Sequence, residues 1–215
     1  MNVTLLFTSR YDGDVRKKKL SDTVLAQQVH GNLIAVASTD NIGKTIPAVD
    51  GIVYKRVDAH PVHLAVRVAD CVPILAYDSL GGVIGAAHAG WRGTIGNIAC
   101  NLISVMKQLG AQPKCIHVSM GPHIGICCYN IKKERALEFQ KRFGTDKKLT
   151  IQKNGRWYMD IAAINRVQLV NSGIQVQNIE ISPICTSCHS DTYFSYRKDL
   201  PRRPASPNRG EQAGE

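Results

Sequence analysis

Two histidines and one cysteine lie at the ends of apolar segments that have the composition of β-strands. Cys71 directly precedes the apolar run Val72–Tyr77, and His88 directly follows the run Val83–Ala87. His30 ends a third such run. Imidazole nitrogens and a thiolate are ligands that zinc prefers, and a catalytic zinc keeps one position open. The three residues therefore form a candidate metal site, although each alone also fits a hydrogen-bonded histidine or a buried cysteine.

A second stretch indicates a site for an anion. Gly90 and Gly93 flank Trp91 and Arg92, directly before a segment with helical periodicity. The first turn of a helix has free backbone N–H groups and a partial positive charge, which attract phosphate. Arg92 adds a charged donor, although the two glycines could equally serve only the turn.

The elements that must position these residues follow from hydrophobic periodicity. Apolar residues at helical spacing predict a helix over Thr94–Leu109, with Gly110 as its cap. Further helices are predicted over Lys132–Phe143 and between Asp160 and Gly173. Short segments rich in valine, isoleucine and other apolar residues predict strands over Asn2–Ser9, Val24–Val29, Leu33–Ala37, His63–Val68, Val72–Tyr77, Val83–Ala87, Lys114–Met120 and Ile179–Ile181. Strands and helices do not alternate regularly, which favours an α+β fold, a single domain with mixed sheets and helices outside, over a doubly wound parallel sheet.

Length, cysteine count and charge narrow the class of protein. A chain of 215 residues favours one domain. Seven cysteines without an export signal favour free thiols and a cytoplasmic location. No apolar run reaches the roughly 20 residues needed to cross a bilayer, so we expect no membrane contact. The net charge is +10, but only 6% of the residues are aromatic and no basic, aromatic stripe is present, so we expect no nucleic-acid partner.

The motifs around these residues occur in the order of a known family. They are Gln28-Val29-His30-Gly31, Ala69-Asp70-Cys71, His88-Ala89-Gly90-Trp91-Arg92-Gly93, Gly121-Pro122-His123-Ile124-Gly125 and Phe194-Ser195-Tyr196-Arg197-Lys198-Asp199. Over roughly residues 5 to 214 the chain resembles the laccase-domain family (YfiH-like proteins), long named multicopper polyphenol oxidases and now regarded as purine nucleoside phosphorylases.

The resemblance implies a fold, a site and an activity. The fold is one of mixed β-sheets layered with helices. The site is a zinc centre, with copper as an alternative, whose ligands His30, Cys71 and His88 are also the catalytic residues. The activity is phosphorolysis of adenosine, inosine and methylthioadenosine, together with deamination of adenosine, so purine nucleosides and phosphate are the expected partners. Candidates for holding phosphate or substrate are Arg10, Arg92, Gly93 and Arg197, and the sequence does not choose among them.

The ends of the chain differ from typical members of the family. We expect residues 1–200 to form the catalytic domain and residues 201–215, which are rich in proline and arginine, to form a tail. The segment between Arg10 and Gln28 is short, and the chain stops where the last strand of the family would follow. The oligomeric state does not follow from the sequence.

Several alternatives remain open. A true multicopper oxidase needs many more imidazoles than seven histidines supply. A metal-free hydrolase with Cys71 as nucleophile and a zinc-binding module without activity are also compatible with the residues. The run from Cys185 to Cys188 and His189 matches a haem attachment motif, which we interpret as accidental. The same residues, completed by Cys127 and Cys128, could form a second zinc site, but core or surface thiols are the simpler interpretation.

Overall fold

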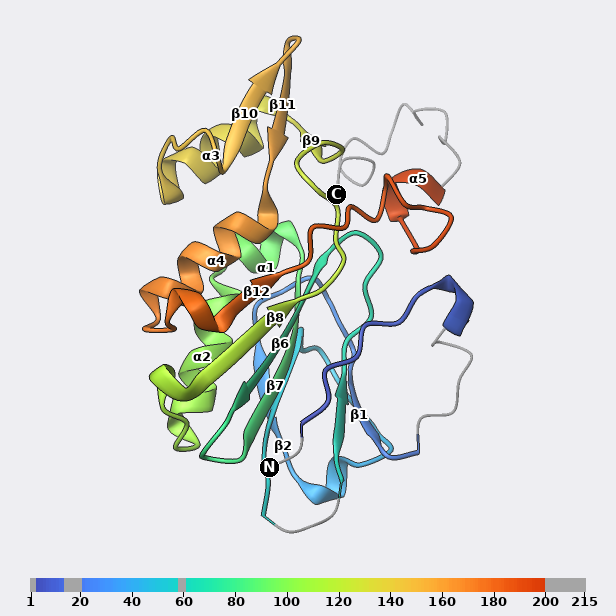
Figure 1. Ribbon diagram of the computed structural model, residues 1–215, viewed down its shortest axis with the longest axis vertical. Helices are drawn as coiled ribbons and strands as arrows, with labels where there is room; N and C mark the ends of the chain where they lie inside the picture. Colours follow the sequence, from blue (N-terminus) through green and yellow to red (C-terminus); the bar gives the residue numbers. More distant parts are fainter. Residues whose placement is uncertain (1–2, 14–20, 58–60, 200–215) are drawn as a thin grey trace.

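A mixed six-stranded sheet forms the centre of the protein (Figure 1). The computed structural model describes residues 3–13, 21–57 and 61–199. The strand order is β12-β8-β6-β7-β4-β2, with antiparallel pairing in the middle and a parallel pair at each edge. The strands are β2 (Ile34–Ala37), β4 (Gly51–Lys55), β6 (Val72–Asp78), β7 (Val83–Ala89), β8 (Ile116–Met120) and β12 (Ile179–Ile181).

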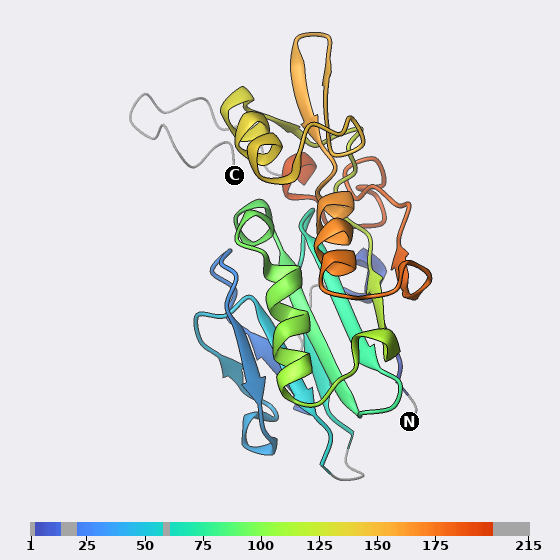
Figure 2. The same ribbon diagram turned by 90° about the vertical axis from the view of Figure 1, so that its left-hand side faces the viewer.

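Helices cover one face of this sheet (Figure 2). Buried residues of α2, among them Leu102 and Met106, pack with Ile74 and Val53 of the sheet and with Leu169 of α4 in one apolar core. The α-helices are α1 (Trp91–Ile95), α2 (Ile98–Gln108), α3 (Lys133–Phe143), α4 (Ile161–Asn171) and α5 (Tyr196–Asp199). Short 3₁₀ turns span Arg10–Asp12, Thr39–Asn41, Pro113–Cys115 and Val176–Asn178.

A smaller parallel sheet covers the opposite face. It consists of β1 (Thr23–Ala26), β3 (Thr45–Ile46) and β5 (His63–Ala65) in the order β3-β1-β5. Side chains alternate across β4, so that Ile52 and Tyr54 join Val24 in the core under this sheet, whereas Val53 points to the helices. Burial of β4 on both faces explains its apolar sequence.

A third sheet lies with α3 at one end of the molecule (Figure 1). It pairs β10 (Thr150–Lys153) with β11 (Arg156–Met159) in a hairpin and adds β9 (Asn130–Ile131). The hairpin turns at Asn154 and Gly155, both of which have a positive φ, as a two-residue turn of this kind requires.

The predicted α+β fold of mixed sheets with helices outside is confirmed, but two predicted elements are wrong. The helix expected over Thr94–Leu109 is divided into α1 and α2, because Asn97 has a left-handed conformation with φ 64°. The strand expected over Asn2–Ser9 is not formed by the described residues 3–9. This segment instead packs Phe7 closely over Gly121, in a position that leaves no space for a Cβ at Gly121.

Among the described residues, no helix is long and apolar enough to cross a bilayer. The basic run of residues 16–19 and the predicted tail of residues 201–215 lie outside the described residues.

Candidate metal centre

The candidate ligands lie where several strands of the six-stranded sheet begin or end on the same side. β4 and β6 begin at this end of the sheet and β7 ends there, as the pairs Gly51↔Ala87 and Val72↔Ala89 show. Cys71 lies directly before β6, and His88 is the last residue but one of β7. β2 runs parallel to β4 and also starts at this end, which places His30, four residues upstream of Ile34, beside them.

The structure brings His30, Cys71 and His88 together. Potential ligand atoms of the three side chains all lie within 4.8 Å of one another. The two imidazole rings meet edge to face, with centroids 4.9 Å apart. His88 is buried, Cys71 is half-buried and His30 is exposed, so the cluster is open to solvent on the side of His30.

Asp50, a residue that the sequence analysis missed, holds two of these segments. Its buried carboxylate accepts hydrogen bonds from the backbone N–H groups of Val29, His30 and Gly31, at 3.2, 3.0 and 2.7 Å. It also pairs with Nδ1 of His88 at 2.8 Å. A carboxylate on Nδ1 fixes the tautomer of a histidine and leaves Nε2 for a metal.

Gly90 provides the space in which the three side chains meet. A Cβ placed on Gly90 would lie 3.3 Å from the Cys71 Sγ, 3.4 Å from His30 Cδ2 and 3.5 Å from His88 Cε1. The backbone is strained beside this space, because His30 and Asp70, the residue before Cys71, have positive φ values of 60° and 85°. Such conformations in non-glycine residues concentrate at functional sites.

The neighbouring charges change the protonation of the metal-free cluster. Burial raises the pKa of the Cys71 thiol, but hydrogen bonds from His30 and His88 outweigh burial and lower this pKa to about 7. Burial lowers the pKa of His88, but the hydrogen bonds to Asp50 and Cys71 outweigh burial and raise it to about 9. For Asp50, burial raises the pKa, yet the bonds from His88, Gly31 and Val29 leave it below its usual value. Between pH 7 and 9 the favoured state is therefore a thiolate beside an imidazolium.

The donor set fits a tetrahedral metal site with one open position. Imidazole nitrogens and a thiolate are ligands that zinc prefers, and two imidazoles with one thiolate also suit copper. The buried carboxylate behind His88 is the usual partner of a metal-bound histidine.

Comparison with known proteins decides the family. A family model described as "Multi-copper polyphenol oxidoreductase laccase" matches residues 13–207. The chain belongs to this laccase-domain family.

Relatives and solved structures agree with this assignment. "Purine nucleoside phosphorylase YlmD" of Geobacillus stearothermophilus is 33% identical over 82% of this chain and 67% of its own. "Adenosine deaminase RL5", from an unknown prokaryotic organism, is 31% identical over 83% of this chain and 71% of its own. The crystal structure of YfiH from Bacillus licheniformis has a TM-score of 0.77 at 31% identity and covers 88% of this chain and 74% of that one.

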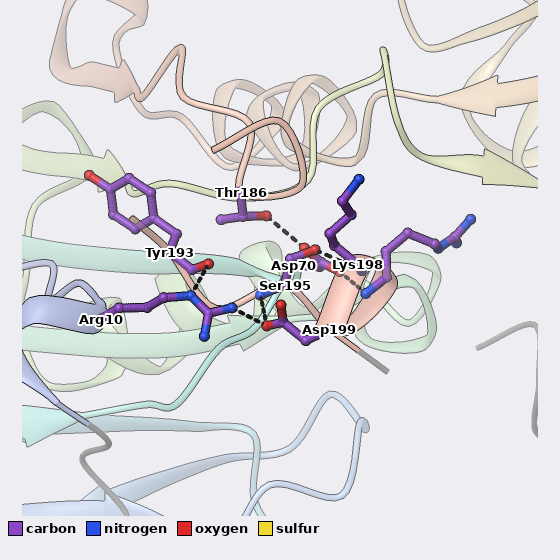
Figure 3. A network of polar contacts seen from close by, with 8 residues as sticks. Arg10, Asp70, Thr186, Tyr193, Ser195, Lys198 and Asp199 are labelled. Atoms are coloured by element: carbon purple, nitrogen blue, oxygen red, sulfur yellow. Dashed lines mark hydrogen bonds and ion pairs between the residues drawn. The ribbon is translucent and has the colours of Figure 1, made fainter. Parts of the chain in front are cut away.

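Two of the predicted phosphate-binding arginines of this laccase-domain chain, Arg10 and Arg197, have partners within the protein, and those of Arg10 lie in the C-terminal segment (Figure 3). Arg10 donates to the Tyr193 carbonyl at 3.0 Å and forms an ion pair with Asp199. The guanidinium of Arg197 donates to Asn130. Both guanidinium groups therefore already have protein partners.

The other two predicted residues lie directly after Gly90, in α1. Arg92 is exposed and its guanidinium lies 4.8 Å from the centre of the Trp91 ring. Gly93 is buried and packs so closely on the backbone of Gly31 that a Cβ would lie 2.5 Å from the Gly31 oxygen. Gly93 is thus needed for packing beside His30.

The sequence contained a weak signal for the missed carboxylate. Asp50 precedes Gly51 and the apolar run Ile52–Tyr54, so it is a polar residue at a strand end like Cys71. The sequence does not give the order of the strands, so it could not show that β4 and β6 start at the same end of the sheet.

Proposed function

We propose that this chain is a purine nucleoside phosphorylase that converts adenosine, inosine or methylthioadenosine and phosphate into the free base and the 1-phosphate of the corresponding sugar. We propose that it also deaminates adenosine, and that His30, Cys71 and His88 are its zinc ligands and catalytic residues. The proposal rests on the convergence of these three side chains, with Asp50 behind His88. The names of the relatives YlmD and RL5 support both activities.

The two proposed reactions differ in the bonds that form and break. In phosphorolysis, a phosphate oxygen forms a bond to C1′ of the ribose while the bond from C1′ to N9 of the base breaks, and its electron pair leaves with the base. In deamination, water adds at C6 of adenine and ammonia leaves. A bound zinc ion would supply a Lewis acid that lowers the pKa of water to about 7.

The protein residues orient and activate this centre. Asp50 holds the His88 ring through Nδ1 and, through three backbone N–H groups, holds the loop that presents His30. The low pKa of Cys71 provides a thiolate at neutral pH. The exposed His30 marks the side from which a nucleoside can approach.

We infer that Arg92 is the main phosphate-binding arginine. Arg92 is exposed, its guanidinium lies against the Trp91 ring, and it follows two residues after Gly90, which lies among the three proposed ligands. Arginine binds phosphate through two parallel hydrogen bonds. Arg10 and Arg197 then have the separate task of holding the C-terminal segment.

The test is to incubate the protein with inosine or adenosine, with and without phosphate, and to quantify hypoxanthine, adenine and ribose 1-phosphate. We expect phosphate-dependent products that disappear in Cys71→Ala and His88→Ala. His117→Ala is the matched control, because His117 stacks on Tyr77 in the sheet and belongs to neither group of potential metal ligands. Activity that survives both active-site substitutions would reject the assigned site.

A metal-free cysteine hydrolase is the second candidate. The thiolate of Cys71 beside the imidazolium of His88 favours it, because such a pair activates a nucleophilic cysteine. A strong chelator separates the two functions. Phosphorolysis should stop when zinc is removed and return when zinc is added, whereas a cysteine hydrolase would remain active in chelator.

A further inference from the structure

Four cysteines outside the proposed active site lie together, two of them exposed, one half-buried and one buried. We propose that Cys127, Cys128, Cys185 and Cys188 bind a second Zn²⁺ ion, which has a structural role. Their sulfur atoms lie within 4.8 Å of one another. None of the four is among the proposed catalytic residues, and all four are free thiols. This inference is independent of the proposed function.

The fold explains why cysteines about 60 residues apart in sequence meet. β8 and β12 are parallel neighbours, with Ile181 opposite Met120, so both strands end on the same side of the sheet. The segments that follow the two strands stay side by side, and His123 forms a parallel bridge with Cys185. Each segment then turns, one through Cys127 and Cys128 and the other through Cys185 and Cys188.

The distances between sulfur atoms match a tetrahedral thiolate site. The Cys188 Sγ lies 3.7 Å from the Cys127 Sγ and 3.4 Å from the Cys128 Sγ. A tetrahedron with zinc–sulfur bonds of about 2.3 Å has its sulfur atoms about 3.8 Å apart. A disulfide would need a separation of about 2.05 Å. Four thiolates fill a structural zinc site completely, with no position left for substrate.

The backbone around the cluster is arranged for thiolates. The N–H of Gly125 donates to the Cys185 Sγ at 3.2 Å, and outer hydrogen bonds of this kind orient metal ligands. Gly125 is also the residue that permits the close approach. A Cβ there would lie 3.3 Å from the Cys127 Sγ and 3.3 Å from the Cys185 Cβ.

The cluster is connected to the proposed active site through Asp70. Thr186, between the two cysteines of the second turn, donates to the Asp70 carboxylate at 2.7 Å (Figure 3). The backbone N–H of Arg197 donates to the other carboxylate oxygen at 2.6 Å. Asp70 directly precedes Cys71. A zinc ion in the cluster would therefore fix the segment of residues 185–199 against the strand end that carries Cys71.

The neighbouring histidine does not belong to the site. His189 bonds through Nδ1 to the Cys185 carbonyl at 3.0 Å, and it is not among the clustered ligand atoms. The ligand set is thus the two adjacent cysteines and the two cysteines separated by two residues, a spacing common in structural zinc sites.

Metal analysis of the purified full chain tests the proposal. We expect about two zinc ions per chain in the wild type and about one in Cys188→Ser. Cys115→Ser is the matched control and should keep both ions, because Cys115 lies outside both groups of potential ligands. The double variant Cys71→Ala/His88→Ala should keep one ion. A double variant without zinc would overturn the proposal. If instead only the site of His30, Cys71 and His88 failed to bind zinc, the wild type and the double variant would both hold one ion.

X-ray absorption at the zinc edge, recorded on the same double variant, gives a result that does not depend on the folding of Cys188→Ser. We expect four sulfur neighbours at about 2.3 Å. Nitrogen or oxygen neighbours would contradict the ligand set. An intact mass about 2 Da below that of the reduced chain would show a disulfide instead, and would also overturn the proposal.

Limited digestion with trypsin tests the structural role. We expect faster cleavage after Arg197 or Lys198 in Cys188→Ser than in the wild type and in Cys115→Ser, because the segment loses its attachment. Equal cleavage rates in the three proteins would show that the cluster does not hold this segment.

Discussion

Replacing Asp50 with asparagine tests whether its carboxylate positions His30 and His88. The carboxylate is fully buried and each oxygen accepts two hydrogen bonds. Oδ1 receives those of His30 and His88, and Oδ2 receives those of Val29 and Gly31. An amide has the same shape but replaces one acceptor with a donor. Whichever oxygen is replaced, two N–H groups then face a donor.

The cost follows from these contacts. A buried donor without a partner costs about 1–3 kcal/mol. His88 can avoid one such loss by moving its proton from Nδ1 to Nε2, so we expect Asp50→Asn to lower the free energy of unfolding by about 3 kcal/mol. The moved proton then occupies Nε2, the atom left for the metal. We therefore expect zinc affinity to fall by about 10- to 100-fold, the usual effect of losing such a partner.

The assay is urea unfolding in chelator, followed by zinc titration against a competing chromophoric chelator. Asp160→Asn is the matched control. Asp160 caps α4 by accepting from the N–H of Ala163 at 2.8 Å, and asparagine caps a helix equally well, so we expect a change below about 0.5 kcal/mol. Equal stability and equal zinc affinity of Asp50→Asn and the wild type would refute the role given to Asp50.

Three further predictions follow from the same geometry. With pKa values of about 7 for Cys71 and about 9 for His88, zinc binding between pH 7 and 9 displaces one proton, that of His88. Isothermal titration should therefore show a zinc affinity that rises about tenfold per pH unit in this range, and more steeply below pH 7. A zinc affinity that does not change with pH would contradict these protonation states. Gly93→Ala should lower the free energy of unfolding by about 1–3 kcal/mol, measured in urea, because its Cβ would meet the Gly31 oxygen; unchanged stability would show that α1 shifts freely. Arg92→Ala should raise the KM for phosphate at least about tenfold in the phosphorolysis assay, with a small effect on kcat, because a charged hydrogen bond is worth about 1.5–3 kcal/mol; an unchanged KM would exclude Arg92 as the main phosphate ligand.

Elements with local signals were predicted well from the sequence. The helix capped by Asp160 and the strand Ile179–Ile181 are present, α3 begins one residue later than expected and α4 ends two residues before Gly173. The hairpin of β10 and β11 was missed, although Asn154 and Gly155 give a strong turn signal.

The division between α1 and α2 depends on contacts between distant residues. Helical periodicity continues through Asn97, but the chain there is shaped by Asn32, whose amide donates to the Gly96 carbonyl at 2.5 Å. Residues 64 positions apart determine this break, and periodicity in one segment carries no information about it.

The candidate site also depends on contacts between residues that are distant in the sequence. The motifs identify the two histidines and Cys71 as candidate ligands, but motif order does not reveal that Asp50 joins His30 to His88 or that Gly90 provides the space between them. The cysteine cluster was only one option among several in the sequence. The parallel pairing of β8 and β12 brings its two halves together.

Anomalous diffraction at the zinc edge, from crystals of the zinc-loaded protein, tests whether His30, Cys71 and His88 bind one metal ion. We expect a peak at about 2.0–2.1 Å from the Nε2 of His88 and from a ring nitrogen of His30, and at about 2.3 Å from the Cys71 Sγ. Density for these three side chains without a metal peak between them, in protein that forms ribose 1-phosphate from inosine, would contradict this site.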